Sequence, residues 1–172
     1  RRGLFRTAYF CSRMVKGSVF FLQGKKIDLK GRNLFQSAGL GCFHALRAIL
    51  FLAPYIALNA VVLEKLRQIV GGSFKGTVSG GGALQPHVDE FFNYIGIPVQ
   101  EGYGLTETCA GLTIQDADDM KTGIAGTLIG CVECRLDSCP DICDKAGLAY
   151  LNTDRKDVEG NDIWGRGEIV IK

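Results

Sequence analysis

The residues best suited to chemistry lie in one short run, Gln100–Thr108, where glycines, an aromatic ring, hydroxyls and a carboxylate follow one another. Gly102 and Gly104 flank Tyr103, so the backbone can approach a ligand closely on either side of a flat ring. A tyrosine held in this way can stack on a base or another planar group. The first half of the run therefore suits the base of a nucleotide.

The second half of the run carries a hydroxyl and an acid. Thr106 offers a hydroxyl to a phosphate oxygen, and Glu107 offers a hard carboxylate to Mg²⁺. Together with the aromatic ring they would suit a nucleotide with its metal. The residues alone leave a second interpretation open, in which the run is a β-turn, the Tyr103 ring packs on the core and Glu107 points into solvent.

A second glycine-rich run precedes a helical pattern, and its residues with little or no side chain are Gly80, Gly81, Gly82 and Ala83. Such a run could form a flat wall for a ligand, or it could simply permit a tight turn from strand to helix. It lacks the Gly-Lys-Ser/Thr of a Walker A loop and the spacing of a Rossmann fingerprint. Helix N–H groups from about Gln85 onward would point toward this turn and favour an anion.

Both runs need α/β elements to position them. Phe74–Ser79 predicts a short strand, and Ile97–Gln100 predicts a second one. Between them, Pro86 suits the first turn of a helix that continues through Tyr94, with apolar residues at helical spacing along one face. Strand, glycine turn, helix and strand in this order are typical of an α/β layer.

Residues 1–71 are basic and mostly helical in pattern. Apolar residues between Phe5 and Val15 predict one amphipathic helix, and residues 17–36, which glycines interrupt, predict a loop or a short strand. Residues 42–70 are the most helical stretch, and Ala48–Leu58 carries no charge. This apolar run is shorter than the roughly 20 residues of a bilayer span, so we expect a buried core helix. A helix lying against a membrane surface is the alternative.

The last third is acidic and punctuated by glycines. Short apolar runs at residues 126–132, 147–151 and 168–171 predict β-strands, and residues 116–119 and 155–162 predict solvated connections. Asp116, Asp118 and Asp119 resemble a calcium loop only superficially, because the required glycine and bidentate glutamate are missing at their positions.

Composition excludes several classes of protein. With 172 residues, 47% of them hydrophobic and 22% charged, the chain is neither disordered nor of low complexity. A net charge of +2 gives no strong attraction to nucleic acid or to a membrane. Nine basic residues fall within residues 1–36, and twelve acidic ones within residues 116–172. The basic third could meet anionic lipid, but we favour a solvated face neutralised by the acidic third.

Seven cysteines are an odd number and cannot all pair within the chain, which favours a reduced, cytoplasmic setting. Four of them, Cys131, Cys134, Cys139 and Cys143, could bind zinc. The gap between the two pairs is short for a structural zinc site, and strand alternation would separate Cys131 from Cys134, so we favour free thiols. We expect neither Cys109 nor His87 to be catalytic. The chain starts at Arg1 and ends within a strand pattern, which suggests an internal fragment.

The motifs resemble those of a known family. Ser79–Leu84 with the helix that follows it, and then Gly102–Thr108, resemble the adenylate-forming (AMP-binding) superfamily, and within it most closely the long-chain acyl-CoA synthetases. Gly165–Ile171 resembles a later glycine–glutamate strand motif of the same family, which is mainly architectural. The resemblance covers residues 72–172 well, whereas residues 1–71 carry no motif that we can name.

The resemblance implies an α/β fold, as part of the large N-terminal domain of an adenylate-forming enzyme. Mixed β-sheets would be layered with helices, and the C-terminal portion would be rich in β-strands. The chain would be one partial AMP-binding domain, 1–172, with a basic helical portion at 1–71, a nucleotide-binding α/β portion at 72–115 and a β-rich portion at 116–172.

The resemblance also implies a two-step reaction in which a fatty acid attacks ATP, giving an acyl-adenylate, and coenzyme A then displaces AMP. Tyr103 would stack on adenine between Gly102 and Gly104, Thr106 would contact phosphate, and Glu107 would hold Mg²⁺. The residues that would flank the adenine and the acyl channel are Gly80, Gly81, Gly82 and Ala83. The implied partners are a fatty acid, ATP and coenzyme A, without nucleic acid, and a peripheral membrane contact stays open.

Several of the family's motifs are missing from the chain. The phosphate loop that ends in Pro-Lys-Gly, the Thr-Gly-Asp segment and the C-terminal lid with its catalytic lysine do not occur in this sequence. We therefore expect the parent protein to be a ligase and the isolated chain to be inactive. The alternatives are a non-catalytic remnant that binds a nucleotide or a lipid, and a family member that acts on an aryl or amino acid.

Overall fold

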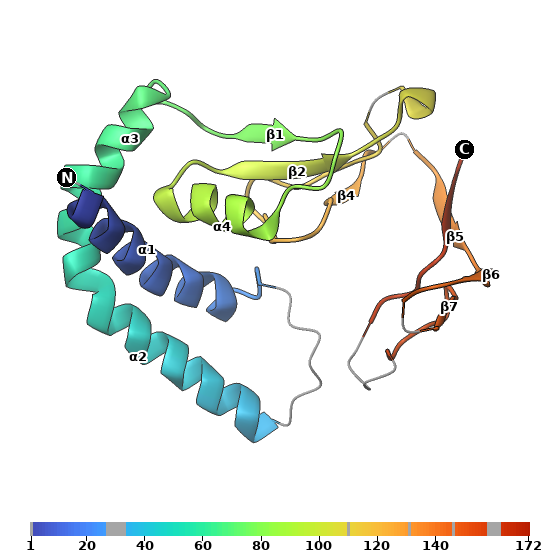
Figure 1. Cartoon of the computed structure of the whole chain (residues 1–172), viewed down its shortest axis with the longest axis horizontal. Helices are drawn as coiled ribbons and strands as arrows, with labels where there is room; N and C mark the ends of the chain where they lie inside the picture. Colours follow the sequence, from blue (N-terminus) through green and yellow to red (C-terminus); the bar gives the residue numbers. More distant parts are fainter. Residues whose placement is uncertain (1, 27–33, 110, 131, 146, 158–162) are drawn as a thin grey trace. The chain divides into compact units, whose positions relative to one another are not determined.

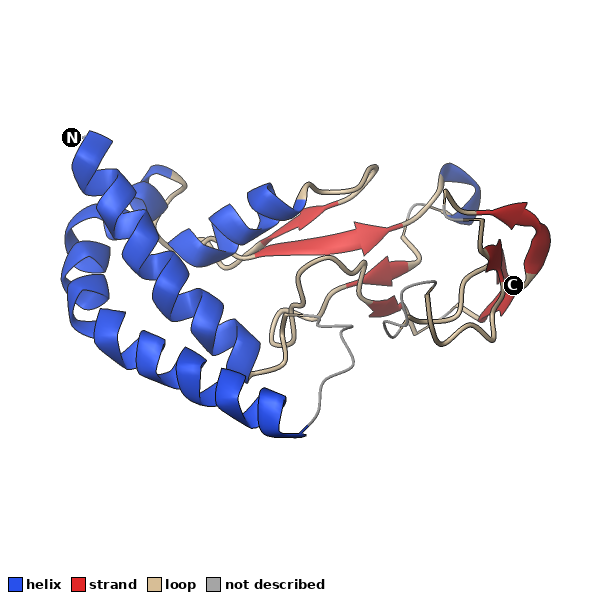
Figure 2. Cartoon of the chain, turned by 60° about the horizontal axis from the view of Figure 1, so that its bottom comes forward, coloured by secondary structure: helices blue, strands red, loops and turns tan. Residues whose placement is uncertain are grey.

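The computed structural model describes residues 2–26, 34–109, 111–130, 132–145, 147–157 and 163–172. The described residues form two compact units, one within residues 2–26 and 34–127 and the other within residues 128–172. The described helices all belong to the first unit (Figures 1 and 2). The mixture of helices and sheets confirms the expected α/β class. The division at residues 71 and 115 stays a prediction.

Helix α1 (Arg2–Leu22) runs alongside helix α2 (Leu34–Leu58), as Figures 1 and 2 show. The predicted first helix is confirmed, but the loop predicted to begin at residue 17 is wrong, because the helix continues to Leu22. Gly17 is a contact point, since a Cβ atom there would lie 3.2 Å from the Tyr94 hydroxyl oxygen. Residues 27–33 of the expected loop lie outside the described residues, and the helix at Leu34–Gln36 replaces its end.

The second helix is much less buried than its composition predicts. No residue of α2 is buried, so the expected core helix is wrong for the described chain. Many of its large apolar side chains are exposed, among them Leu34, Phe35 and Leu50. A π-helix (Asn59–Leu63) and α3 (Glu64–Ile69) continue it. Among the described residues, Leu34–Ile69 is the one helix long and apolar enough to cross a membrane, a test that core helices of soluble proteins also pass.

A small sheet carries the segments that bear the motifs. Strand β1 (Thr77–Ser79) pairs in parallel with β2 (Val99–Tyr103), and β2 pairs in antiparallel fashion with β3 (Thr113–Ile114). Strand β4 (Thr127–Leu128) completes the order β1-β2-β3-β4. Both predicted strands are confirmed with shifted bounds. Because β2 extends to Tyr103, the aromatic motif starts within the strand instead of after it.

Helix α4 (Pro86–Ile95) confirms the predicted helix and ends one residue later. Two cationic side chains bind carbonyls at its C-terminal end, where the helix dipole favours positive charge. Lys16 donates to the Asn93 carbonyl at 3.2 Å, and Arg67 donates to the Ile95 carbonyl at 2.8 Å. Burial, and then the charge of Arg67, lower the pKa of Lys16 to about 8. These bonds join α1 and α3 to α4, which lies along the sheet.

The apolar core of the first unit lies where the helices meet the start of β2. Its buried cluster consists of Ala8, Leu63, Ile95 and Ile97. Partly buried aromatic rings pack against this cluster, and Tyr9 lies 5.3 Å from Phe91 between ring centroids. The core therefore anchors the beginning of β2, while its other end carries the aromatic motif.

The second unit consists of two antiparallel strand pairs, β5 (Cys134–Asp137) with β8 (Glu168–Ile171) and β6 (Cys139–Cys143) with β7 (Ala149–Tyr150). The strand predicted at residues 168–171 is confirmed. The strands predicted at 126–132 and 147–151 are shorter, at Thr127–Leu128 and Ala149–Tyr150.

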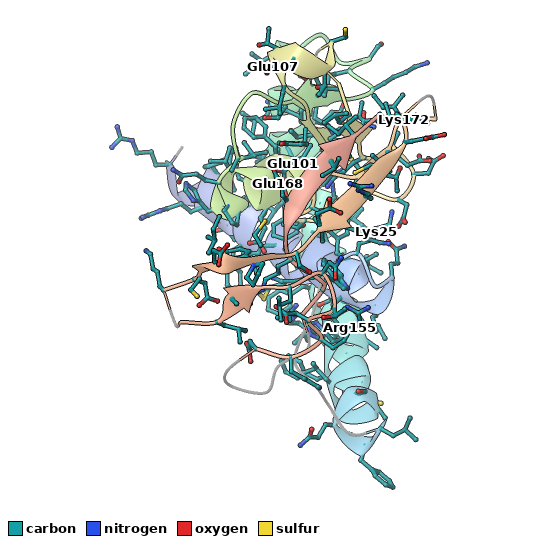
Figure 3. All side chains as sticks on the ribbon, turned by 90° about the vertical axis from the view of Figure 1, so that its right-hand side faces the viewer. Lys25, Glu101, Glu107, Arg155, Glu168 and Lys172 are labelled. Carbon is teal, nitrogen blue, oxygen red and sulfur yellow. The ribbon has the colours of Figure 1, made fainter. Side chains whose placement is uncertain are left out.

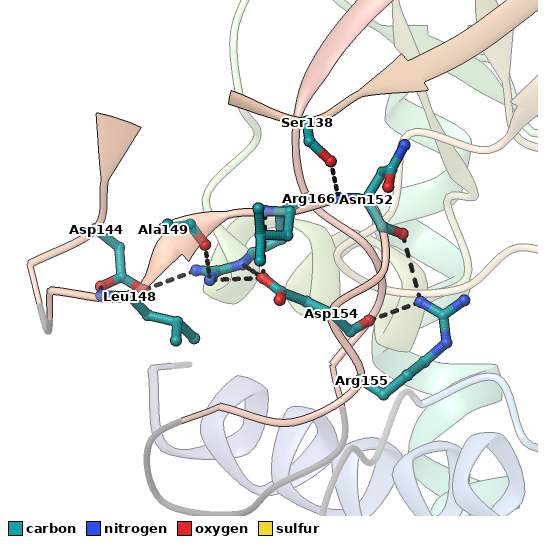
Figure 4. Close-up of polar contacts among 9 residues, drawn as sticks. Ser138, Asp144, Leu148, Ala149, Asn152, Asp154, Arg155 and Arg166 are labelled. Carbon is teal, nitrogen blue, oxygen red and sulfur yellow. Dashed lines mark hydrogen bonds and ion pairs between the residues drawn. The ribbon is translucent and has the colours of Figure 1, made fainter. Parts of the chain in front are cut away.

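Arg166 of the glycine–glutamate motif joins three segments of the second unit (Figure 4). Its guanidinium contacts Asp144 at 2.7 Å and Asp154 at 2.9 Å, and it donates to the Ala149 carbonyl. The hydrogen bonds that Arg166 donates to these carboxylates raise its pKa above the usual value. At Gly167 a Cβ atom would overlap the Asp137 carbonyl. The motif therefore ties strands and loops together.

The cysteines of the second unit lie on and beside its strands. Cys134 starts β5, Cys139 and Cys143 bound β6, and each of these three is a free thiol. Cys131 lies outside the described residues. Within the part of the chain that the structure describes, no three potential metal ligands gather. Free thiols in place of a zinc site stay a prediction.

Candidate functional site

A cavity of about 660 Å³ opens in the first unit where the two glycine-containing motifs meet. Three segments line it, namely the turn that leads into α4, the end of β2 with the residues after it, and a loop that precedes β4. The lining residues are Gly81, Gly82, Ala83, Leu84, Pro86, Glu101, Gly102, Tyr103, Gly104, Leu105, Gly123, Ile124 and Ala125.

The glycine turn forms one wall of this cavity because it carries almost no side chain. Gly81 has a φ of +79°, a left-handed conformation that other residues rarely adopt. A Cβ atom at Gly80 would lie 3.3 Å from the Gly102 carbonyl oxygen, so this glycine contacts the strand and does not line the cavity. The turn thus lies directly against the end of β2.

Tyr103 lines the cavity from the end of β2. It is the last residue of β2, pairs with Thr113 across the ladder, and accepts the Leu112 N–H at 2.8 Å on its carbonyl oxygen. These contacts fix its backbone, while the residue stays 36% exposed and lines the cavity. A planar ligand can reach such a ring, in keeping with the stacking role that the sequence predicts.

Thr106 and Glu107 lie beside the cavity without lining it. Both are exposed on a short helical turn, Thr106–Thr108, and Figure 3 shows Glu107 on that turn and Glu101 on β2. The Thr108 hydroxyl accepts the Leu105 N–H at 3.0 Å and donates to the Leu105 carbonyl at 2.9 Å. Thr108 therefore closes the turn that presents the other two side chains, a contribution that the sequence motif did not reveal.

Two further carboxyl groups lie at the sheet. Glu101 lines the cavity, and Asp89 of α4 is only 3% exposed. One Asp89 oxygen accepts the Asn93 side-chain amide, and the other has no hydrogen-bond partner among the described residues. Burial, reinforced by the charge of Glu101, raises the pKa of Asp89 to about 6. The sequence did not indicate a special role for Asp89, because there it looks like any other polar residue of an amphipathic helix.

The third wall comes from Gly123, Ile124 and Ala125, which sequence reasoning missed. Just beyond them, Gly126 has a φ of +85°, and a Cβ atom there would overlap the Ile114 carbonyl of β3. This glycine lets the loop come close to the strand. The spacing of Gly123 and Gly126 was the available signal, but it does not say which segment the loop contacts.

The structure thus brings most of the predicted binding residues together. Six of the predicted residues line one cavity, namely Gly81, Gly82, Ala83, Gly102, Tyr103 and Gly104. Gly80 contacts the Gly102 carbonyl of β2, and Thr106 and Glu107 lie on the adjacent turn. Mg²⁺ is commonly held by one or two carboxylates together with substrate phosphates. The single exposed carboxylate of Glu107 fits that kind of binding.

Comparison with known proteins gives a consistent result. The family model described as AMP-binding enzyme matches residues 9–172. "Long-chain-fatty-acid--CoA ligase 1" of Saccharomyces cerevisiae is 40% identical over 114 residues, which cover 66% of this chain and 15% of the yeast protein. "Long chain acyl-CoA synthetase 8" of Arabidopsis thaliana is 40% identical over 74 residues, 42% of this chain and 10% of the plant protein.

Among solved structures, the anthranilate CoA ligase AuaEII in complex with anthranoyl-AMP is similar, with a TM-score of 0.38 and 17% identity. The match covers 57% of this chain and 16% of that one. The chain spans only about 15% and 10% of the length of its yeast and plant relatives.

Proposed function

Because the chain belongs to the AMP-binding enzyme family, we propose that it forms the nucleotide-binding part of a ligase that activates a long-chain fatty acid with ATP. The observation that carries this proposal is the cavity that the glycine turn Gly81–Ala83 and Tyr103 line together. The names of the yeast and plant relatives support a long-chain fatty acid as the substrate.

The proposed reaction has two steps. A carboxylate oxygen of the fatty acid attacks the α-phosphorus of ATP, and the bond to the departing pyrophosphate breaks, which leaves an acyl-adenylate. The thiolate of coenzyme A then attacks the acyl carbon and expels AMP. The chain's own contribution is to hold the nucleotide in place, since positioning and charge neutralisation supply much of the rate in such transfers.

In this proposal each wall of the cavity has one task. Tyr103 stacks on the adenine ring, and Gly102 and Gly104 let the backbone lie close to the nucleotide. The residues that flank the adenine and the start of the acyl channel are Gly80, Gly81, Gly82 and Ala83. The small side chains of this turn keep the wall flat, so that a planar base fits between it and the tyrosine ring.

Thr106 and Glu107 act at the phosphate end in this proposal. Their helical turn directly follows the strand that carries Tyr103, so a nucleotide stacked on that ring would extend its phosphates toward the turn. The Thr106 hydroxyl donates to a phosphate oxygen, and Glu107 is the ligand for Mg²⁺. When bound, Mg²⁺ neutralises charge that develops on the phosphates.

The test uses the protein that carries this chain, with Glu107→Ala beside the wild type. We expect fatty-acid-dependent release of pyrophosphate from ATP, and a loss of about 10²-fold or more in the variant. Asp141→Ala, an exposed acidic residue of the second unit, is the matched control and should keep its rate. No release with any fatty acid, aryl acid or amino acid would instead favour the non-catalytic remnant.

The location of the protein is a separate proposal. A cytoplasmic protein with a peripheral membrane contact would account for the exposed apolar side chains of α2, of which Leu46, Ile49 and Leu50 are 68%, 70% and 73% exposed. Flotation with anionic phosphatidylserine vesicles tests this. We expect the wild-type chain to float with the vesicles. A variant with glutamine at these three positions should stay in the bottom fraction of the gradient. Equal flotation of both would contradict the contact.

A further inference from the structure

We propose that Gln115 and Thr113 are positioning residues that hold the loop at residues 121–126 against the sheet and thereby set one wall of the cavity. The nature of the ligand in that cavity rests on the proposed function. The tethering of the loop does not, because it follows from contacts within the first unit. Neither side chain lines the cavity itself.

The Gln115 side chain links two walls of the cavity. The residue is 4% exposed, and its amide nitrogen donates to the carbonyls of Lys121 and Ile124. Its amide oxygen accepts the backbone N–H of Glu101 at 3.3 Å. Glu101 belongs to β2 and Ile124 belongs to the loop, and both line the cavity. One amide group therefore sets the separation between strand and loop.

Thr113 adds a second tether on the same side of the strand. Its hydroxyl donates to the Ala125 carbonyl at 2.6 Å. Residues two apart in an extended strand share a face, so Thr113 and Gln115 reach the loop together. Between them, the backbone of Ile114 touches Gly126, where there is no room for a side chain. The loop is thus held along its whole length.

These bonds matter because the loop has little structure of its own. Besides the three tethers, Lys121 forms an ion pair with Asp119. Thr122 pairs with Lys26 in an isolated β-bridge, donates its N–H to the Lys25 carbonyl, and has its side chain at Asp89 of α4. The three tethers occupy the carbonyls of Lys121, Ile124 and Ala125. The contacts of Lys121 and Thr122 hold the start of the loop, so without the tethers the wall at Ile124 and Ala125 would be free to move away from the strand.

The variants separate tethering from simple packing. Thr113→Val removes the hydroxyl at nearly constant shape, and Thr113→Ser restores it. Gln115→Glu keeps the shape and the acceptor for Glu101, but it places an oxygen where the amide nitrogen faced two carbonyls. Thr77→Val makes the same chemical change as Thr113→Val on the exposed strand β1, away from the loop, and serves as the matched control.

Limited trypsin digestion measures how easily the loop opens, because the peptide bond after Lys121 lies within the loop. We expect cleavage there to accelerate about 2- to 10-fold in Thr113→Val and about 10-fold or more in Gln115→Glu, from the loss of one and of two hydrogen bonds. Cleavage after Lys75, outside the loop in the same unit, should stay at the wild-type rate. Thr113→Ser and Thr77→Val should match the wild type at both bonds.

Binding of AMP, measured by equilibrium dialysis, gives the second readout. We expect the dissociation constant to rise in the same order as cleavage after Lys121, with recovery in Thr113→Ser. Unchanged cleavage after Lys121, or equal acceleration after Lys75, would overturn the tethering, since the residues would then be inert or merely support the fold. Faster cleavage after Lys121 in a chain that never binds AMP would support the tethers and contradict the proposed function.

Discussion

Replacing the buried Asp89 by asparagine should change how the stability of the first unit depends on pH. The carboxyl of Asp89 is 3% exposed, and burial together with the charge of Glu101 raises its pKa from 3.8 to about 6. The folded chain therefore binds this proton more tightly than the unfolded chain does. The resulting stabilisation is fully present below the unfolded pKa, and it is lost as the pH rises through the folded pKa.

The size of the effect follows from the shift. A change of about 2 pKa units corresponds to roughly 3 kcal/mol between the two protonation states. The wild type should therefore lose up to about 3 kcal/mol from this group between about pH 4 and pH 7.5, whereas Asp89→Asn should lose none of it. In Asp89→Asn, an amide nitrogen takes the place of the oxygen that has no partner. This lowers the free energy of unfolding by about 1–3 kcal/mol, but by the same amount at every pH.

The assay is urea unfolding at a series of pH values, followed by far-ultraviolet circular dichroism, because the described helices all lie in the first unit. The quantity of interest is the difference in free energy of unfolding between wild type and variant. We expect this difference to shift in favour of Asp89→Asn as the pH rises through 6. Asp141→Asn, at an exposed position, controls for the substitution. A difference that stays constant with pH would refute the reasoning.

Two further substitutions test the close contacts. Gly126→Ala should destabilise the first unit by several kcal/mol because its Cβ would overlap the Ile114 carbonyl, whereas Gly123→Ala, also at positive φ but with open space around it, should cost only about 1 kcal/mol in urea unfolding. An equal loss of unfolding free energy in the two variants would mean that the overlap at Gly126 does not contribute. Arg166→Lys should lower the thermal midpoint of the second unit more than Arg155→Lys, and Trp164 fluorescence can follow it. Among the described residues, Arg166 contacts two carboxylates, whereas Arg155 donates to backbone carbonyls.

Local signals predicted the helix α4 and much of the cavity. Pro86 at the first turn and apolar residues at helical spacing act within a few residues, so they identify a helix without tertiary information. The glycine turn and Tyr103 were predicted for a similar reason, because the residues that suggest their roles are adjacent in the sequence. The structure adds that both line one cavity, which requires the parallel pairing of β1 with β2.

Features that depend on distant contacts were missed. Gly17 was interpreted as a helix breaker, but its lack of a side chain accommodates Tyr94, which is 77 positions later in the chain. The role of Gln115 follows from hydrogen bonds to a loop and to β2, which spacing alone cannot reveal. The exposure of α2 was also missed, since an apolar composition does not say how much surface its neighbours cover.

Binding of AMP to the chain, compared between Tyr103→Phe and Tyr103→Ala, tests the central claim most directly. Phenylalanine keeps the ring and should bind AMP as tightly as the wild type does. Alanine removes the stacking surface and should weaken binding about 5- to 150-fold, which corresponds to about 1–3 kcal/mol for a stacked base. Equal affinity of wild type and Tyr103→Ala, or no binding of AMP to the well-folded chain, would contradict the assignment of this cavity to a nucleotide.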